Sequence, residues 1–444
     1  MALARALEQS LIQWKAMSAR KPLLLRGARQ VGKSFLVESF GKENFEHLVV
    51  INFELSPEFK SCFESLDPNV ICNILNVLQN IPIIAGKTLL FLDEIQDCPQ
   101  AIQSLRYFKE KMPELHVIGA GSLLELALRN ADYRMPVGRI SSFYLYPLSF
   151  KEFLQAYNAS ALASIATATI EHPVPLAIHH YLLKQVHLYA ILGGMPEALS
   201  IYQETNELRR VQVVQSEILE AYQNDFGHYE GIAPVSHLKT CFNMIPKMIG
   251  QQIKYNKIDP ELRSKELKQA LSALEAASIL QRISATSAQG FPLDSTVNEK
   301  KFKLNFVDIG LVKRANKLDA ELLLQEDIML LNHGALAEQF VGQELLAYSD
   351  NYETAKLYFW ARDLPATAEV DYIFPCGEVI YPIEVKAGAV GKMRSLTQYL
   401  VEHDCKFGIC ISKAPLAFEN NILSVPFYMI GELSRLLSSI PLKS

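Results

Sequence analysis

Residues 27–34 read Gly-Ala-Arg-Gln-Val-Gly-Lys-Ser, which is a complete G-x-x-x-x-G-K-S/T phosphate loop. One apolar run at 23–25 precedes it and another at 35–37 follows it, which is the strand–loop–helix context that the motif requires. Backbone N–H groups of such a loop close around phosphate oxygens, and the amino terminus of the next helix adds positive potential. The expected phosphate-binding residues are Gly27, Ala28, Arg29, Gln30, Val31, Gly32, Lys33, Ser34 and Phe35.

Four side chains near this loop are expected to carry the chemistry of ATP and Mg²⁺. Lys33 would reach the β- and γ-phosphates, and the hydroxyl of Ser34 would bind Mg²⁺. The apolar run 88–92 ends in Asp93, a second Mg²⁺ ligand, and Glu94, which would polarise the attacking water. Alone, this acidic pair could be the solvated end of a strand, but beside a complete phosphate loop it predicts Mg²⁺-dependent ATP hydrolysis.

Two further catalytic candidates follow. One expected strand leads into a Gly-Ala-Gly-Ser sequence, whose last residue, Ser122, could sense a γ-phosphate, cap the next helix, or do both. Arginines at 129, 134 and 139 come next, and Arg139 is the preferred candidate for stabilising transition-state charge in a neighbouring subunit. For each arginine, a solvated position on a loop is an equally good interpretation.

The segment 1–150 alternates short apolar runs with helical patterns. This alternation predicts an α/β fold with a parallel sheet covered by helices on both faces. The expected strands are Leu23–Leu25, Leu48–Phe53, Thr88–Leu92, Leu115–Gly119 and Ser142–Leu145.

Composition places limits on the rest of the chain. The length of 444 residues suits about three domains. A net charge of −5 excludes a protein that is basic throughout, so any DNA-binding surface must be local. The seven cysteines include no C-x-x-C pair, which predicts reduced thiols of a cytoplasmic protein without structural zinc. No apolar run approaches 18 residues, so no membrane span is expected.

The middle of the chain is expected to be mainly helical. Residues 147–230 have helical patterns, interrupted by a Gly-Gly-Met-Pro turn at 193–196. Beyond them, helices at 238–249 and 263–276, with wing strands at 280–283 and 302–306, predict a winged helix. Between 239 and 268 there are seven Lys and Arg against three acidic residues, which is consistent with DNA contact, with a solvated surface or with a protein-docking module.

The C-terminal segment carries a second set of charged residues: Glu338, Asp371, Glu384 and Lys386. Glu384 and Lys386 are two apart on one expected strand, so they point to the same face. A turn at 375–378 would bring Asp371 beside them, and a helix starting near Glu338 could add a third carboxylate. Oxygen ligands of this kind suit Mg²⁺ or Mn²⁺, with Lys386 positioning water or stabilising developing charge. The pattern is typical of restriction-type nucleases, but a half-exposed sheet often produces it without a metal.

In the order of these motifs, the chain resembles prokaryotic AAA-type P-loop ATPases that carry a C-terminal domain of unknown function with a PD-(D/E)XK nuclease-like core. The resemblance covers nearly the whole chain and rests on the four residues just described and on short sequences at 26–34, 92–96, 119–122, 136–139, 147–150, 193–196 and 308–311. One departure is Ala120, where Ser or Thr would be expected, so a sensing role rests on Ser122 alone.

The resemblance implies an ATPase module, a winged helix and a PD-(D/E)XK-like domain, which together with the helical segment make four expected domains. They are an AAA-type ATPase domain at 1–150, a helical lid at 151–232, a winged-helix domain at 233–315 and a PD-(D/E)XK nuclease-like domain at 316–444. Our first hypothesis is a cytoplasmic ATP hydrolase whose nucleotide state controls a DNA-directed C-terminal domain. The second is an ATP-dependent switch or scaffold that acts on protein partners through an inactive nuclease fold. The third is a metal-dependent nuclease with ATP as effector, and assembly into a homo-oligomer is left open.

Overall fold

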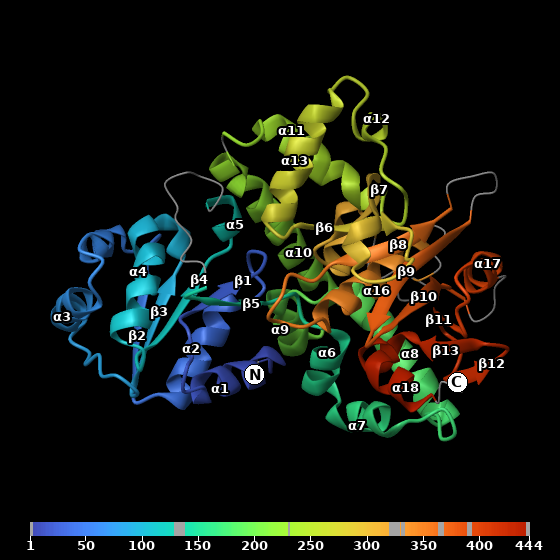
Figure 1. The fold of residues 1–444 in the computed structure, drawn as a ribbon, viewed down its shortest axis with the longest axis horizontal. Helices are drawn as coiled ribbons and strands as arrows, with labels where there is room; N and C mark the ends of the chain where they lie inside the picture. The colour runs from blue at the N-terminus through green and yellow to red at the C-terminus, as the bar shows by residue number, and fades with distance from the viewer. Residues whose placement is uncertain are drawn as a thin grey trace.

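The computed structural model describes residues 3–127, 138–229, 231–318, 329, 334–362, 368–388 and 393–440. Its strands form a five-stranded sheet and an eight-stranded sheet. Figure 1 shows the two sheets toward opposite ends of the molecule, with helices α9 and α10 between them.

The five-stranded sheet has the order β2-β3-β4-β1-β5, and its neighbouring strands are parallel. The prediction of an α/β fold with a parallel sheet is thereby confirmed, and each expected strand lies within one residue of an observed one. The strands are β1 (Leu23–Arg26), β2 (His47–Asn52), β3 (Thr88–Asp93), β4 (His116–Ala120) and β5 (Ser141–Tyr144).

Helices cover both faces of this sheet because its central strands are apolar on both sides. Along β3, Leu89 and Phe91 pack into one buried cluster with α1 and α2, whereas Leu90 and Leu92 pack into a second cluster with α3 and α4. The alternation follows from the period-two geometry of a strand. The elements are α1 (Leu7–Ala16), α2 (Lys33–Asn44), η1 (Pro57–Phe63), α3 (Pro68–Gln79), η2 (Ile95–Asp97), α4 (Pro99–Lys111) and α5 (Leu124–Ala127).

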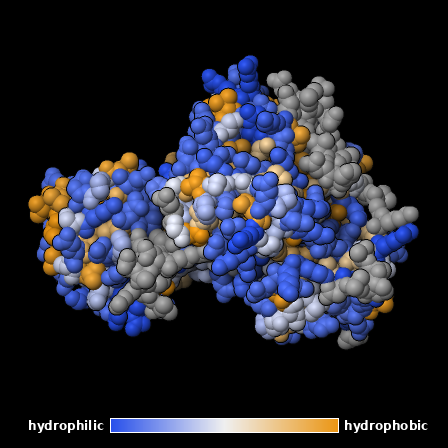
Figure 2. All heavy atoms as spheres, turned by 90° about the horizontal axis from the view of Figure 1, so that it is seen from above, coloured by the Kyte–Doolittle hydropathy of each residue, from blue (hydrophilic) through white to orange (hydrophobic). Residues whose placement is uncertain are grey.

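Helix α3 leaves a second apolar stripe in solvent. Val70, Ile74, Val77 and Leu78 lie at helical spacing and are all exposed. Figure 2 shows hydrophobic side chains gathered at the end of the molecule that α3 forms. Contiguous exposed apolar surface of this kind often marks a site of association.

Residues 150–229 are helical, as predicted. The first of these helices, α6, begins with a reciprocal cap, in which Ser149 accepts a hydrogen bond from the backbone of Glu152 and the Glu152 carboxylate accepts one from the backbone of Ser149. The elements are α6 (Phe150–Tyr157), α7 (Ala159–Thr167), α8 (Leu176–Leu192), α9 (Pro196–Thr205), α10 (Leu208–Asn224) and η3 (Asp225–Tyr229).

The next segment contains the expected helices and an antiparallel pair of strands, β6 and β7. These strands do not form a separate wing, because β6 also pairs in parallel with β8 and so belongs to the eight-stranded sheet. The expected boundary at 315/316 therefore runs through one sheet. The elements are α11 (Val235–Met244), η4 (Ile245–Lys247), α12 (Tyr255–Ile258), α13 (Ser264–Ala276), β6 (Leu280–Thr286), η5 (Leu293–Thr296), β7 (Val297–Phe306) and α14 (Ile309–Ala315).

The eight-stranded sheet has the order β12-β13-β11-β10-β9-β8-β6-β7. The predicted hairpin is present, since β9 and β10 are antiparallel and Cys376 pairs with Val379 across the turn. The remaining elements are α16 (Ala335–Ala347), β8 (Leu357–Ala361), β9 (Glu369–Cys376), β10 (Val379–Val385), α17 (Arg394–Glu402), β11 (Gly408–Ser412), β12 (Ala417–Glu419), β13 (Ile422–Pro426), η7 (Phe427–Glu432) and α18 (Leu433–Ser439).

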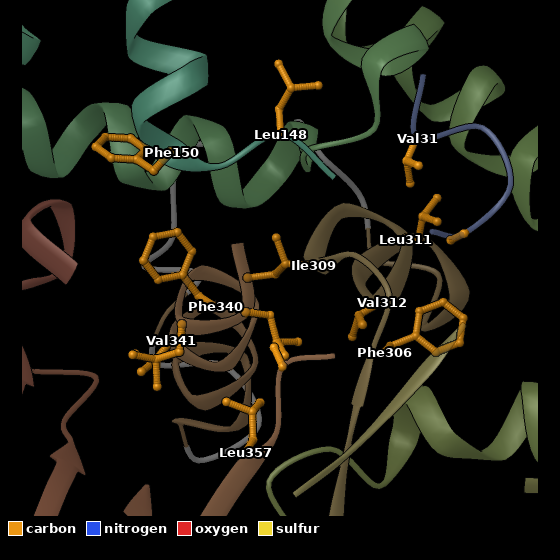
Figure 3. Close-up of a cluster of buried hydrophobic side chains, with 14 of the residues drawn as sticks. Val31, Leu148, Phe150, Phe306, Ile309, Leu311, Val312, Phe340, Val341 and Leu357 are labelled. Carbon is orange, nitrogen blue, oxygen red and sulfur yellow. The ribbon is translucent and has the colours of Figure 1, made fainter. Parts of the chain in front are cut away.

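One buried cluster connects the two halves of the molecule. Figure 3 shows residues of the phosphate loop, the start of the lid, α14 and α16 contributing to it, among them Val31, Leu148, Phe150, Ile309, Leu311 and Phe340. The rings of Phe150 and Phe340 lie edge to face with their centroids 6.5 Å apart. Within the described residues, no helix has both the length and the apolar character needed to cross a membrane.

Candidate functional site

The phosphate loop connects the end of β1 to the start of α2, as the sequence predicts. Gly27 and Gly32 both have positive φ angles, of 143° and 92°. A Cβ atom at Gly27 would lie 2.1 Å from the carbonyl oxygen of Leu145, which directly follows β5. Glycine is therefore required at this position by both backbone conformation and space.

Lys33 places a buried charge inside the loop. Its Nζ atom donates hydrogen bonds to the carbonyl oxygens of Gly27 at 3.0 Å and Ala28 at 2.7 Å. Within the described part of the chain, no carboxylate lies at ion-pair distance from this ammonium. Burial lowers the pKa of Lys33 to about 8, because the charged form loses its hydration. An anion at the loop would supply the missing counter-charge.

Ser34 and Asp93 lie together at the carboxyl edge of the sheet. The Ser34 hydroxyl donates to Asp93 Oδ2 at 2.9 Å, and the side-chain amide of Asn52 donates to the same oxygen at 3.0 Å. Burial raises the pKa of Asp93, and the hydrogen bond from Ser34 partly opposes this. A hydroxyl and a carboxylate this close together are suited to hold Mg²⁺ beside a phosphate loop. Sequence analysis did not identify Asn52, although its position at the end of the neighbouring strand was a usable signal.

Glu94 follows directly, in the left-handed backbone region with φ of 47°. Its carboxylate accepts a hydrogen bond from Gln96 Nε2 at 2.8 Å, so the acid is oriented by a neighbouring amide. A Cβ atom at Gly121 would lie 2.0 Å from Gln96 Oε1, which explains the small residue in the Gly-Ala-Gly-Ser sequence. The next residue, Ser122, is buried beside this group. Gln96 was missed as an orienting residue in the sequence.

Arg5, which no sequence motif singled out, fixes the loop from the other side. The guanidinium of this buried residue donates to the carbonyl oxygen of Val31 at 2.8 Å, to that of Tyr146 at 2.6 Å and to Glu152 at 3.1 Å. One side chain thus connects the phosphate loop, the end of the ATPase domain and the first lid helix.

Arg29 points away from the phosphate position and toward the lid. Its Nη1 atom lies 2.8 Å from both carboxylate oxygens of Asp225, and the Tyr222 hydroxyl donates to its carbonyl oxygen at 2.8 Å. Two other loop residues differ in exposure, since the side chain of Val31 is buried and that of Phe35 is mostly exposed. If Arg29, Val31 and Phe35 bind phosphate as expected, they would do so through their backbone rather than through their side chains.

Arg139 lies at the opposite edge of the sheet. It precedes β5, whose first residue pairs with Leu23 at the start of β1, whereas the phosphate loop follows the end of β1. Its Nε atom pairs with Glu110 of α4 at 3.1 Å. From this position it cannot serve its own chain's phosphate site, and a role in a neighbour's site stays a prediction. Arg129 and Arg134 lie outside the described residues.

The Gly-Gly-Met-Pro turn contacts the phosphate loop on one side and Asp308 on the other. The backbone N–H of Gly194 donates to Asp308 Oδ2 at 2.6 Å, and a Cβ atom at Gly193 would lie 2.2 Å from Asp308 Oδ1. Pro196, at the start of α9, lies 3.4 Å from the position that a Cβ atom at Gly32 would take. The Gly-Gly-Met-Pro turn therefore packs between the phosphate loop and Asp308. We call the contacts of Gly193 and Gly194 with Asp308 the joint.

Helix α16 holds this joint to the second sheet. Gln343 accepts a hydrogen bond from the backbone N–H of Ile309 at 2.8 Å, and Gln339 pairs with both backbone groups of Phe306. Glu344 caps α6, because its two oxygens accept from the backbone N–H of Phe150 at 3.0 and 3.1 Å.

The four C-terminal residues singled out in the sequence come together. The backbone N–H of Val385 donates to Asp371 Oδ2 at 2.8 Å, which places Asp371 beside Glu384. Lys386 Nζ lies 2.6 Å from Glu384 Oε1. Burial raises the pKa of Glu384, and the nearby charge of Asp371 raises it further.

A residue that sequence analysis missed lies at the centre of this cluster. Lys303 of β7 is almost completely buried, and its Nζ atom lies 3.0 Å from Glu338, 2.5 Å from Glu369 and 3.7 Å from Asp371. Burial alone would lower the pKa of Lys303, but these carboxylates raise it above its usual value. Sequence analysis assigned residue 303 to a separate winged helix, so nothing pointed to it.

The cluster as it stands does not fit a metal ion. In the described ranges, no three His, Cys, Asp or Glu side chains are arranged to hold one. The ammonium of Lys303 already contacts two of the expected ligands, Glu338 and Asp371. The predicted Mg²⁺ or Mn²⁺ site at Glu338, Asp371 and Glu384 would require Lys303 to move away.

Comparisons with protein families match three segments of the chain. Residues 19–154 match an AAA domain, residues 183–322 match a domain of unknown function (DUF8612) and residues 333–429 match another domain of unknown function (DUF4143). The chain therefore carries an AAA-type P-loop ATPase domain followed by two domains of unknown function. Its second matched segment ends beyond β7 and α14, and so combines lid helices with two strands of the second sheet.

Individual relatives are distant. An uncharacterized protein of Haemophilus influenzae is 24% identical over 268 residues, which are 58% of this chain and 59% of that protein, so the chain spans just under three fifths of its relative. A Walker-type ATPase of Pyrococcus abyssi is 15% identical, with a TM-score of 0.46 over 71% of this chain and 96% of that one. The Aeropyrum pernix Orc1 protein in complex with DNA is 12% identical, with a TM-score of 0.28 over 71% and 93%.

Proposed function

We propose that this chain is a Mg²⁺-dependent ATP hydrolase whose nucleotide state is transmitted through the lid to the C-terminal sheet. The observation that carries the first part is the buried ammonium of Lys33, bonded to carbonyl oxygens and lying near the Ser34–Asp93 pair. A buried cation without a counter-ion is costly, and the triphosphate of ATP would remove that cost.

Each residue of the site then has a defined task. Lys33 and the loop backbone would hold the phosphates, and Ser34 and Asp93 would hold Mg²⁺, which neutralises charge on the phosphate oxygens. Glu94, oriented by Gln96, would position the attacking water. Ser122, which is buried just beyond the end of the neighbouring strand β4, would sense the γ-phosphate.

The test compares three variants by titration with a fluorescent ATP analogue and by phosphate release. Lys33→Ala should abolish binding, whereas Lys42→Ala, an exposed lysine on the same helix, should bind like wild type. Glu94→Gln should bind ATP but lose turnover by about 10²-fold or more, since general-base contributions are of this size. Equal affinity of wild type and Lys33→Ala would refute the proposal.

Transmission to the C-terminal sheet is supported by the joint at Gly194 and Asp308 and by α16. The same helix supplies Gln343 and Glu344 to the lid side and Glu338 to the carboxylate cluster. If the lid shifted on nucleotide binding, α16 would therefore move with it and would displace Glu338 in the carboxylate cluster.

A second candidate for the C-terminal part is a switch that acts on a protein partner through an inactive nuclease-like fold. It is favoured over cleavage of DNA because the cluster has four carboxylates, Glu338, Glu369, Asp371 and Glu384, against two lysines, Lys303 and Lys386. An acidic face repels the phosphate backbone. Nicking of plasmid DNA in Mn²⁺ that is lost in Glu384→Ala and Lys386→Ala would instead establish the nuclease.

A further inference from the structure

We propose that Lys303 is the built-in cation of the carboxylate cluster, and that it occupies the position in which a nuclease of this pattern would hold a divalent metal. The inference concerns only the second sheet and does not depend on ATP hydrolysis.

The first argument is the way the cluster is assembled. Its carboxylates come from α16, β9 and β10, but the central ammonium comes from β7, which is an edge strand of the sheet. In the order of strands, β6 and β8 separate β7 from β9. Neighbouring strands lie about 4.8 Å apart, so a flat sheet would separate β7 and β9 by about 14 Å. The lysine side chain alone is too short to span that distance.

Curvature of the sheet would shorten the remaining gap between Lys303 and the carboxylates. Both intervening strands have register shifts, at Ser284/Ala285 in β6 and at Tyr358/Trp360 in β8. Such irregularities bend strands and increase their twist. Helix α16 contacts β7, β8 and β10, as expected if it fills the concave face. The backbone is thus built in a way that delivers this lysine to three carboxylates.

The second argument is that lysine and metal exclude each other. Glu338 Oε2, an oxygen that would have to turn toward a metal, lies 3.0 Å from Lys303 Nζ. The other oxygen of Glu369 is also engaged, accepting a hydrogen bond from Gln252 at 2.7 Å. A divalent ion within a few ångströms of a buried ammonium would meet strong repulsion where water cannot screen it. The cluster holds one cation at its centre, and that cation is covalently attached.

The third argument is the contrast with Lys386, the lysine that the nuclease pattern assigns to catalysis. Lys386 is partly exposed and pairs with Glu384 at the edge of the cluster. Of the three carboxylates that Lys303 holds, Asp371 is the one whose charge acts on Lys386. Lys303 is buried at the centre. Lys386 is therefore placed as the nuclease pattern requires, but Lys303 occupies the central position in which that pattern would hold the metal.

The experiment measures Mn²⁺ binding by electron paramagnetic resonance on the full chain without nucleotide. All variants carry Asp93→Asn, which removes a carboxylate of the ATP site from the measurement. We expect the Asp93→Asn protein with Lys303 intact to show no Mn²⁺ site at the cluster. Adding Lys303→Met should create a site there, with an affinity at least tenfold higher than any residual Mn²⁺ binding of the protein with Lys303 intact. Lys300→Met is the matched control, because Lys300 is exposed on the same strand and should change nothing.

Thermal unfolding gives an independent readout. Mn²⁺ should raise the midpoint of Lys303→Met and leave that of the Lys300→Met control unchanged. The proposal is overturned if the protein with Lys303 intact binds one Mn²⁺ that Asp371→Asn removes, or if a folded Lys303→Met binds none. If Lys303→Met does not fold under any condition, the protein with Lys303 intact decides: no Mn²⁺ site supports the proposal, and a site sensitive to Asp371→Asn refutes it.

Discussion

The carboxylate of Asp308 accepts a hydrogen bond from the backbone N–H of Gly194 at 2.6 Å, across 114 residues of sequence. The same side chain caps α14 by accepting from the backbone N–H of Leu311 at 3.0 Å. Gly194 is two residues before Pro196, which lies against the phosphate loop. The turn at 193–196 therefore connects Asp308 to the candidate ATP site. Asp308 is also fully buried, so its bonds are not shared with solvent.

This geometry predicts the effect of Asp308→Asn. Asparagine keeps the shape but offers one acceptor oxygen in place of two, so one of the N–H groups of Gly194 and Leu311 loses its partner. We expect the free energy of unfolding to fall by about 1–3 kcal/mol, the usual cost of a buried unsatisfied group. ATP should still bind, because Lys33 and Ser34 are untouched, but its effect on hydrogen exchange in α16 should be lost.

Hydrogen–deuterium exchange with mass spectrometry, with and without ATP, measures this response over residues 335–347. Asp350→Asn is the control, since Asp350 is exposed and remote from the joint. If ATP alters exchange in α16 equally in wild type and Asp308→Asn, the signal does not pass through Asp308.

A second prediction concerns pH and Glu344. Burial raises the pKa of Glu344 from its ordinary 4.5 to about 8, while the hydroxyls of Tyr348 and Tyr189 and the backbone N–H of Phe150 lower it and the charge of Glu152 raises it. The unfolded chain loses this proton above about pH 4.5, but the folded chain keeps it up to about pH 8. The folded state therefore binds more protons in between, and its stability falls as pH rises from 4.5 to 8.

Glu344→Gln should remove much of this slope. Each pKa unit corresponds to about 1.4 kcal/mol, so the contribution is on the order of a few kcal/mol. Urea unfolding at pH 5, 6.5 and 8 tests it against Glu353→Gln, an exposed glutamate of the same chain. A slope that is the same in both variants would show that Glu344 is ionised in the folded state throughout this range.

The sequence was informative where one segment determines one element. The strands of the first sheet, the phosphate loop and the β9–β10 hairpin could be predicted because apolar runs, glycines and turn residues are local signals. It was not informative about strands β11 and β13, which are short apolar runs whose partners lie elsewhere in the chain: β11 pairs with β10, and β13 pairs with β11.

The candidate sites show the same division. Ser34 and Asp93 could be expected together because each belongs to its own local motif, whereas Arg5 and Lys303 act through contacts with residues far away in sequence. Lys303 is buried between the buried residues Phe302 and Leu304, and no period or motif in the sequence distinguishes it from an exposed lysine earlier on the same strand. The register shifts in the two strands between β7 and β9 are features of strand pairing, which no local pattern encodes.

A third prediction follows from the tight packing of Gly27. Gly27→Ala should abolish ATP binding, because the new Cβ atom would overlap the carbonyl oxygen of Leu145 and the loop would have to move. Gly227→Ala is the matched control, since a Cβ atom there meets nothing within 4 Å. Isothermal titration with ATP and Mg²⁺ measures both. Unchanged affinity in Gly27→Ala would mean that the loop adopts another conformation when it binds ATP.

The last prediction concerns assembly and Arg139. Arg139 pairs with Glu110 near the end of α4, and the next residue, Lys111, pairs with Asp67, which caps α3. Arg139 therefore lies on the flank that carries the exposed apolar stripe of α3. If that stripe packs against a second copy of the chain, Arg139 would be carried toward the neighbour, and the ATPase rate per chain should rise with protein concentration.

A second arginine shares the partner of Arg139 and provides a matched control. Arg106 and Arg139 both pair with Glu110 Oε1 at 3.1 Å and are about equally exposed. Arg139→Ala should lower turnover at high protein concentration by tenfold or more without weakening ATP binding, as the loss of a trans-acting arginine would. Arg106→Ala should leave turnover unchanged. Equal losses in both variants would assign the effect to the ion pair with Glu110, and a rate independent of concentration would exclude action on a neighbour's phosphate.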